Sequence, residues 1–352
     1  MVFDAPPAQP VHAWMPSSSC GSGCIETTDR VGAARLAARV TQIAGLMIGF
    51  PIVNALTPRG RREAVQREFS RALLGTLGIK VRVIDNRVAA RTVTEPAQPD
   101  LVTHIGAALR RDDRGAQDGE PVVFAPADTG VLVVTGHIGW TDVVALAAVQ
   151  PLGFVARADL IEWPLLGKLA ERVRVIPIER ERLRALPGVV ATIAARLSAG
   201  ERVAAFPEGT TWCGRAYGRM RPALFQAAID AGAYVQPVRL RYLDRHGAPC
   251  SVPGFVGDDT FATSALRILR SRGIVAEITL EPLEHPGLDR RDLAQRCERA
   301  VRAAEQSVHS TDPTWIEATT TRVEDPTPRP RRRTIPLFRG RSRDATPHIP
   351  AD

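Results

Sequence analysis

The stretch VLVVTGHIGWTDVVALAAV, residues 131–149, decides the predicted fold of this chain. Its first five residues, 131–135, form an apolar run of the kind found in buried strands, and residues 141–149 have the apolar spacing of a helix. The same succession recurs after residue 79, where short β-branched runs alternate with alanine-rich runs. Such alternation is typical of an α/β domain.

Strands and helices can be placed along the chain from these runs. Strands are expected at residues 80–84, 131–135, 154–156, 173–178, 202–206, 235–240 and 274–280. Helices are expected at residues 101–110, 141–149, 164–171, 189–199, 223–231 and 291–306. We therefore predict an α/β fold with a central, mostly parallel sheet flanked by helices and with its functional residues where strands end.

The chain divides into four predicted regions. Residues 1–34 are rich in Pro, Ser and Gly without the apolar run of a secretory signal, and they are expected to form a flexible leader. Residues 35–78 are expected to form membrane-associated helices, and residues 79–309 the α/β domain. Residues 310–352 contain PRPRRR and are expected to be a disordered basic tail, either a tether to anionic lipid or a solvated segment without a role.

The membrane prediction rests on VTQIAGLMIGFPIVNAL, residues 40–56, which has no charged residue and has arginines on both sides. Its length lies at the lower edge of what spans a bilayer, and Pro51 interrupts it, so a span and an interfacial helix are both open. In residues 62–78, apolar side chains at helical spacing alternate with arginines. That pattern suits either an anionic lipid surface or an ordinary surface helix.

The bulk composition limits the classes of partner. The net charge is +8, which favours anionic partners. Aromatic residues make up only 5% of the chain, and no basic stretch is interleaved with them, as stacking on nucleic-acid bases would require. Anionic membrane lipids are therefore the expected partners, and nucleic acid is not.

The five cysteines are an odd number without a regular disulfide spacing, which fits a reducing, cytoplasmic environment. Cys20 and Cys24, in the run SSSCGSGC, have the appearance of half a metal site. No second Cys or His pair follows nearby at ligand spacing, so no metal is expected.

Two motifs carry the candidate chemistry. His137 and Asp142, with four residues between them, follow the strand at 131–135. The carboxylate can hold one ring nitrogen, which leaves the other free to take a proton from a hydroxyl, although this spacing alone is also common in purely structural roles. The second motif is FPEGTT, residues 206–211, whose glycine would let backbone N–H groups approach an anion; a plain tight turn is the alternative.

Two further segments complete the pattern. VIPIERER carries Arg180 just after a strand, where a guanidinium can bind a phosphate with two hydrogen bonds. VQPVRLRY, residues 235–242, is a predicted buried strand broken by Pro237. In this order the H-x4-D pair, IPIER, FPEGT and VQPV resemble the glycerolipid acyltransferase family of the lysophosphatidic acid acyltransferase type, from about Phe69 to about Tyr242.

The resemblance implies a role for each matching residue. His137 would be the general base and Asp142 the residue that orients it, with backbone amides near the motif stabilising the oxyanion. The implied substrate-binding residues are Arg180, Phe206, Pro207, Glu208, Gly209 and Thr210.

The implied reaction moves a fatty acyl group from acyl-CoA or acyl carrier protein to the hydroxyl of a lysophospholipid. The foremost acceptor would be 1-acylglycerol-3-phosphate, giving phosphatidate in phospholipid biosynthesis. The reaction would need neither a metal nor an organic cofactor and would take place at the cytoplasmic face of the cell membrane.

The sequence departs from the family pattern at two places. Gly139 stands where many members have serine, and Thr211, Trp212 and Cys213 follow FPEGT where arginine and serine are usual. The second change removes a possible phosphate ligand and leaves lyso-ornithine lipid open as the acceptor. Two other functions also stay open: hydrolysis of an acyl thioester or ester by the same pair, and non-catalytic lipid binding.

Overall fold

The computed structural model describes residues 15–26, 29–87, 122–158, 175–180 and 182–302. Seven strands form one sheet in the order β1-β7-β6-β2-β5-β3-β4. Their bounds are β1 Ile79–Asp85, β2 Val131–Val134, β3 Gly153–Arg157, β4 Ile176–Ile178, β5 Arg202–Ala205, β6 Tyr234–Leu243 and β7 Ile274–Leu280. Strand β7 runs antiparallel to β6, and the other pairings are parallel, so the predicted mostly parallel α/β sheet is confirmed.

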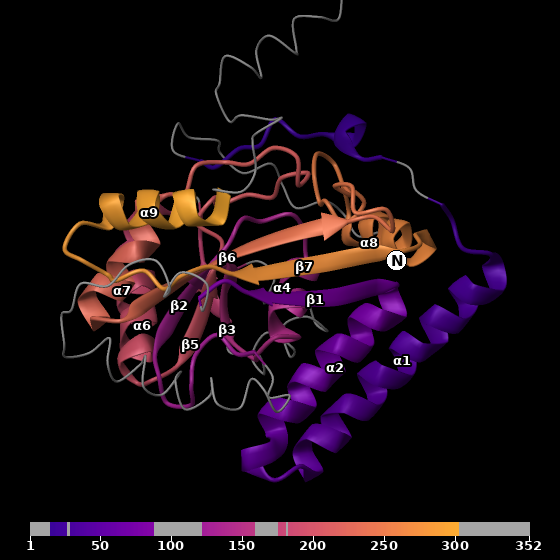
Figure 1. Cartoon of the computed structure of the whole chain (residues 1–352), viewed down its shortest axis with the longest axis horizontal. Coiled ribbons are helices and arrows are strands. Elements are labelled where there is room, and N and C mark those ends of the chain that lie inside the picture. Colours follow the sequence, from indigo (N-terminus) through magenta and orange to yellow (C-terminus); the bar gives the residue numbers. More distant parts are fainter. Residues whose placement is uncertain (1–14, 27–28, 88–121, 159–174, 181, 303–352) are drawn as a thin grey trace, which may run out of the picture. The chain divides into compact units, whose positions relative to one another are not determined.

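Alternate residues of β2 face two separate hydrophobic cores. Val131 and Val133 lie in the core that also holds Leu146, while Leu132 and Val134 lie in the core that holds Ile193. All four strand residues are buried, which explains why the strand is a continuous apolar run rather than an alternating one. The helices that cover the sheet are α4 Thr141–Ala147, α6 Leu186–Ser198, α7 Gln226–Ala231, α8 Phe261–Arg270 and α9 Arg290–Arg302 (Figure 1).

The register of the sheet brings the two candidate motifs together. Strands β2 and β5 are neighbours, and Val134 at the end of β2 pairs with Ala205 at the end of β5. Both strands run in the same direction, so the turn after β2 and the turn after β5 leave the sheet side by side. These are the turns that contain His137 and the FPEGT segment.

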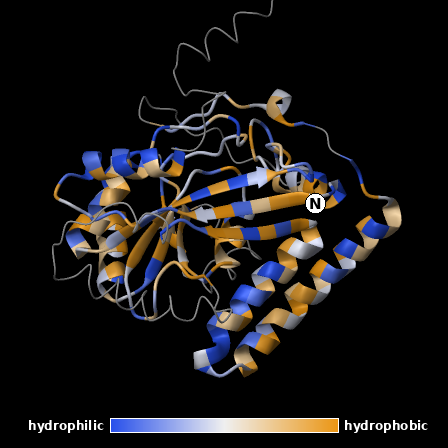
Figure 2. Cartoon of the chain, viewed as in Figure 1, coloured by the Kyte–Doolittle hydropathy of each residue, from blue (hydrophilic) through white to orange (hydrophobic). Residues whose placement is uncertain are grey.

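Two long helices precede the sheet. Helix α1 (Ala33–Leu56) begins before the predicted apolar stretch and continues through Pro51, and none of its residues is buried. Among the described residues it is the one helix long and apolar enough to cross a membrane. Apolar residues outnumber polar ones along it (Figure 2), which suits a helix that associates with a membrane.

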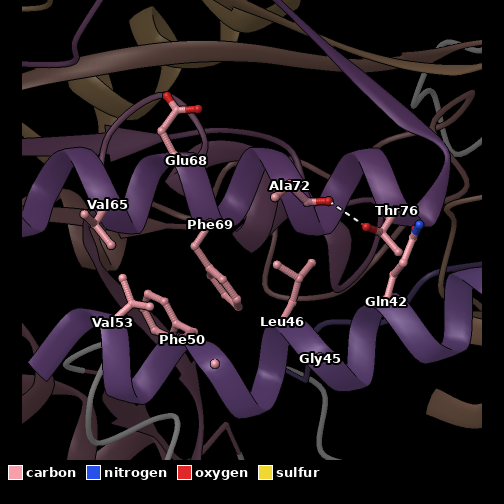
Figure 3. A pocket seen from close by; sticks show the side chains of 11 residues that line it. Gln42, Gly45, Leu46, Phe50, Val53, Val65, Glu68, Phe69, Ala72 and Thr76 are labelled. Atoms are coloured by element: carbon pink, nitrogen blue, oxygen red, sulfur yellow. Dashed lines mark hydrogen bonds between the residues drawn. The ribbon is translucent and has the colours of Figure 1, made fainter.

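Helix α2 (Arg62–Leu77) lies against α1 and links it to the domain. Leu74 and Leu77 are buried, and the helix ends at Gly78 with φ of 85°. An apolar groove runs between the two helices, where Phe50 and Phe69 stack with ring centroids 4.0 Å apart (Figure 3). Both predicted N-terminal helices are therefore present, and α2 packs on the domain as well as on α1.

The structure differs from the sequence prediction in several elements. Helix α8 was not predicted, and the helix expected at 223–231 is a 3-10 turn, Pro222–Phe225, followed by α7. Part of the predicted leader, residues 15–26, packs on the domain, since Cys20 is buried in a small cluster with Trp212 and Val256. The helices expected at 101–110 and 164–171 and the tail at 310–352 lie outside the described residues.

Candidate active site

The turn after β2 brings His137 and Asp142 into contact. Asp142 lies in the first turn of α4, and its Oδ2 is 2.9 Å from Nδ1 of His137. The His137 side chain is 15% exposed, whereas that of Asp142 is fully buried. One edge of the imidazole is thus held by the carboxylate, at the end of the sheet where ligands of α/β proteins usually bind.

The Asp142 carboxylate accepts three further hydrogen bonds. The backbone N–H groups of Ile138 and Gly139 donate to Oδ2 over 2.7 and 3.0 Å, and the Tyr242 hydroxyl lies 2.9 Å from Oδ1. These donors stabilise a buried negative charge. Since a carboxylate only accepts, we assign a proton to Nδ1 of His137, which leaves Nε2 as the nitrogen that can take a proton.

Aromatic stacking fixes the plane of the imidazole. The rings of His137 and Phe206 lie with centroids 4.0 Å apart at an angle of 17°, and Phe206 in turn stacks on Phe154 at 6.5 Å. The first residue of the FPEGT segment therefore contacts the candidate base directly.

The buried Glu208 side chain links the turn after β5, where it lies, to the turn after β2. Its Oε2 accepts a hydrogen bond of 3.0 Å from the His137 backbone N–H. Its Oε1 lies 3.4 Å from a guanidinium nitrogen of Arg302, at the end of α9. Burial raises the pKa of Glu208 to about 8, although the His137 N–H and Arg302 both act to lower it.

The rest of the FPEGT turn is fixed by backbone contacts. Pro207 is buried, and its carbonyl accepts from the Arg221 N–H over 3.0 Å. Gly209 has φ of 77°, and a Cβ there would lie 2.6 Å from Cγ of Pro16, so glycine is required. Thr210 is half-buried.

Arg180 lies apart from this pair. It is half-buried in the turn after β4, which stands three strands away from β2 in the sheet. At the usual strand spacing this is about 14 Å. Arg180 therefore lies at the same end of the sheet as His137, three strands away.

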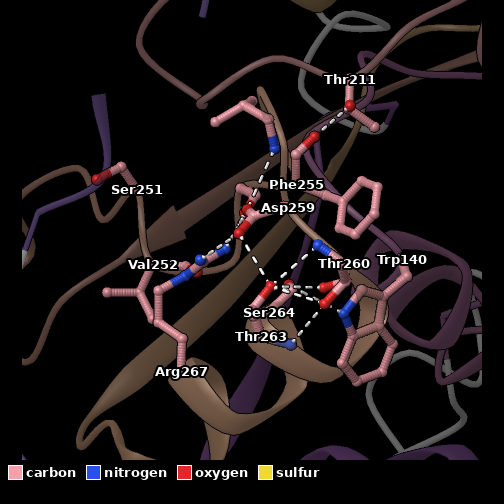
Figure 4. Close-up of polar contacts among 12 residues, drawn as sticks. Trp140, Thr211, Ser251, Val252, Phe255, Asp259, Thr260, Thr263, Ser264 and Arg267 are labelled. Atoms are coloured by element: carbon pink, nitrogen blue, oxygen red, sulfur yellow. Dashed lines mark hydrogen bonds and ion pairs between the residues drawn. The ribbon is translucent and has the colours of Figure 1, made fainter. Parts of the chain in front are cut away.

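A loop between β6 and α8 forms a further side of the site. Ile138 O accepts from the Phe255 N–H over 2.9 Å, and the Thr211 hydroxyl donates to the Phe255 carbonyl. Arg267 of α8 holds this loop, since its guanidinium binds Val252 O over 3.0 Å and both carboxylate oxygens of Asp259 (Figure 4).

Packing of the same loop explains one departure from the family pattern. A Cβ at Gly139 would lie 2.2 Å from the carbonyl oxygen of Pro253, far closer than atoms can approach. The turn after His137 and the loop before α8 thus leave no room for a serine at position 139.

Similarity to known proteins agrees with the geometry of the candidate site. The model of the family described as "Acyltransferase" matches residues 121–241. A lyso-ornithine lipid O-acyltransferase of Pseudomonas aeruginosa is 38% identical over 179 residues, covering 49% of this chain and 67% of that protein. A 1-acyl-sn-glycerol-3-phosphate acyltransferase of Neisseria gonorrhoeae is 32% identical over 198 residues, 56% of this chain and 76% of that protein. The chain belongs to the acyltransferase family.

A solved structure also resembles this acyltransferase. The 1-acyl-sn-glycerophosphate acyltransferase PlsC from Thermotoga maritima is similar with a TM-score of 0.49 and 14% identity, over 82% of this chain and 97% of that one.

Three backbone N–H groups in the motif of this acyltransferase already donate hydrogen bonds to carboxylates of the protein. The N–H of His137 donates to Glu208, and those of Ile138 and Gly139 donate to Asp142. The expectation that amides near the motif stabilise an oxyanion therefore does not hold for these three, whose task is to fix the turn.

Sequence reasoning missed two residues of the candidate site. Tyr242, at the far end of VQPVRLRY, reaches Asp142, and Arg302 reaches Glu208 from α9. A tyrosine at the end of a buried strand was a signal that its hydroxyl needs a partner. Arg302 gave no signal, because it is one of several arginines in a polar helix.

Proposed function

We propose that the protein transfers a fatty acyl group from a thioester, acyl-CoA or acyl carrier protein, to the hydroxyl of a lysolipid. The observation that carries this proposal is the buried Asp142 carboxylate on Nδ1 of the partly exposed His137 imidazole. The arrangement provides a general base at a sheet edge that also carries the FPEGT turn and Arg180. Membership of the acyltransferase family supports the reaction class.

The proposed reaction begins when Nε2 of His137 takes the proton of the acceptor hydroxyl. The hydroxyl oxygen attacks the thioester carbonyl carbon, the C–S bond then breaks, and the leaving thiolate recovers the proton from the imidazolium. Asp142 stabilises the imidazolium while it exists. The buried contacts of Asp142 hold the ring in one orientation, which reduces the cost of reaching the transition state.

The predicted binding residues take different tasks in this proposal. Arg180 and Thr210, both half-buried, contact the polar head of the acceptor. Phe206 stacks on the base, whereas Pro207, Glu208 and Gly209 set the shape of the turn. In this scheme no metal or organic cofactor takes part in the chemistry.

The proposed acceptor is first of all 1-acylglycerol-3-phosphate, the acceptor named for the Neisseria relative. Lyso-ornithine lipid is a second candidate because no arginine directly follows FPEGT in this chain. The Thr211 hydroxyl there donates to the Phe255 carbonyl, and Trp212 and Cys213 are buried. The Pseudomonas relative bears the name of that second activity.

The proposed setting is the cytoplasmic face of the membrane, among anionic lipids. The exposed α1 helix supports insertion into the bilayer, and arginines flank its apolar stretch. Anionic headgroups favour such flanking arginines.

The test uses the full-length protein in detergent with radiolabelled palmitoyl-CoA, or palmitoyl acyl carrier protein, and a panel of lysolipids. Transfer to one acceptor, reduced at least about 100-fold in His137→Ala, is expected. His246→Ala is the matched control, since His246 lies in an exposed loop, and it should keep full activity. Release of free palmitate from every mixture would instead establish a hydrolase, and undiminished transfer by His137→Ala would refute the assigned base.

A further inference from the structure

A cluster of three cysteines lies beside the site without a part in the proposed reaction. Cys20 and Cys24 come from the N-terminal segment, and Cys213 comes from the loop after FPEGT. Their three sulfur atoms all lie within 4.8 Å of one another. The sequence offered only the first two as half a metal site, and the fold supplies a third thiol from a distant position in the chain.

The cluster is enclosed by the fold. Cys20 and Cys213 are 7% and 3% exposed, and Cys24 is half-buried. Trp212 and Val256 pack around them. Three free thiols gathered in such a place are an uncommon arrangement unless they share a ligand, since a buried cysteine with only a packing role needs no second thiol.

Tight backbone turns hold two of the three cysteines in place. Cys24 closes a 3-10 turn, Ser22–Cys24, in which its N–H donates to Gly21 O over 3.0 Å. Gly214, directly after Cys213, has φ of 85°, and the N–H groups of Arg215 and Ala216 bond the Cys213 sulfur.

We propose that Cys20, Cys24 and Cys213 bind one zinc ion as three thiolate ligands. Thiolates select soft or borderline metals, and zinc binds sulfur at about 2.3 Å in tetrahedral sites. Ligand sulfurs of such a site lie about 3.8 Å apart, a separation that the present cluster reaches with small side-chain movements. Binding releases the thiol protons, and a water or another donor completes the fourth position.

The zinc ion has a structural role in this proposal. It links residues 15–26 to the loop after FPEGT. Pro16 of the same N-terminal segment lies against Gly209 of FPEGT. The backbone N–H of Trp212, next to Cys213, donates to the His137 carbonyl over 2.7 Å. The metal therefore braces the turn that carries the base while remaining outside the chemistry.

The first experiment measures metal content. The full-length protein is produced with zinc in the medium, purified anaerobically without chelators and analysed by mass spectrometry for zinc, iron and copper. About one zinc ion per chain is expected, with loss of at least nine-tenths of it in Cys24→Ser. Cys250→Ser is the matched control, because Cys250 is buried outside the cluster, and it should keep its zinc.

Two other measurements make the proposal refutable even if a variant folds poorly. In the wild type, a thiol reagent should release zinc to a colorimetric chelator, and a chelator should lower Tm, whereas Tm of Cys24→Ser should not respond. A wild-type protein without zinc, or with iron or copper in its place, would overturn the assignment. An intact mass about 2 Da lower, with a disulfide between two of the three cysteines, would overturn it in favour of a redox pair.

Discussion

The Glu208 carboxyl lies at the candidate site in a buried environment, with 4% of the residue exposed. It is buried between the His137 N–H and Arg302, and its pKa is raised from 4.5 to about 8, chiefly by burial. Because the folded protein keeps this proton to a higher pH than the unfolded chain does, the proton stabilises the fold at low pH, and that stabilisation is lost as pH rises from about 4.5 to about 8.

Replacement of Glu208 should therefore change the pH dependence of stability. Between pH of about 5 and 8, this residue makes the free energy of unfolding fall by up to about 1.4 kcal/mol per pH unit. Glu208→Gln, whose amide oxygen can still accept from His137, should remove that component. Urea unfolding of both proteins at several pH values checks it, and parallel pH curves would show that Glu208 is ionised throughout.

At the scale of elements, the turn after β2 and the loop before α8 are packed backbone against backbone. Gly139→Ser would restore the residue that many family members carry, but its Cβ would meet Pro253 O at 2.2 Å. We expect a loss of about 1–3 kcal/mol in stability from the forced shift, and at least about a tenfold fall in kcat because His137 moves with the turn.

A second glycine provides the control for this substitution. Gly188 lies in α6, and a Cβ added there would have no neighbouring atom within 4 Å, so Gly188→Ala should leave activity unchanged and keep or raise Tm. Thermal unfolding and steady-state kinetics separate the two variants. A fully active Gly139→Ser would mean that the loop held by Arg267 yields more easily than its hydrogen bonds indicate.

At the scale of the whole molecule, α1 is a helix whose length and apolar composition suit association with a membrane. Ile48 and Ile52 of this helix are 72% and 59% exposed. Exposing such apolar side chains to water costs free energy, which insertion into a bilayer removes. Aspartate at both positions should reduce cosedimentation with anionic lipid vesicles at least about tenfold, since a charge inside a bilayer costs about 2.5–3.5 kcal/mol.

The control for the membrane variant is Leu288→Asp, because Leu288 is 97% exposed and lies in the loop before α9. It should bind vesicles as the wild type does. Circular dichroism verifies that both variants are folded. Equal vesicle binding by the double variant would place the membrane contact elsewhere in the chain.

The sequence alone was sufficient for the features whose cause is local. Strand β7 was predicted at its observed bounds and the other strands near theirs, because short runs rich in β-branched residues indicate strands. The His137–Asp142 contact was predictable because both residues lie in one strand-to-helix turn. The family was predictable as well, because its motifs are short segments that occur in a fixed order along the chain.

Tertiary structure decided what depends on residues far apart in the chain. The hydrogen bond between Glu208 and the His137 backbone depends on the register of β2 and β5. Tyr242 and Arg302 reach the site from β6 and α9, elements far away in the sequence. Helix α8 was not predicted, although its sequence is amphipathic and a Thr260–Thr263 capping box marks its start. The cysteine cluster was hidden for the same physical reason: spacing along a sequence reveals neighbours within one element, whereas contacts between elements are fixed by how their apolar faces pack.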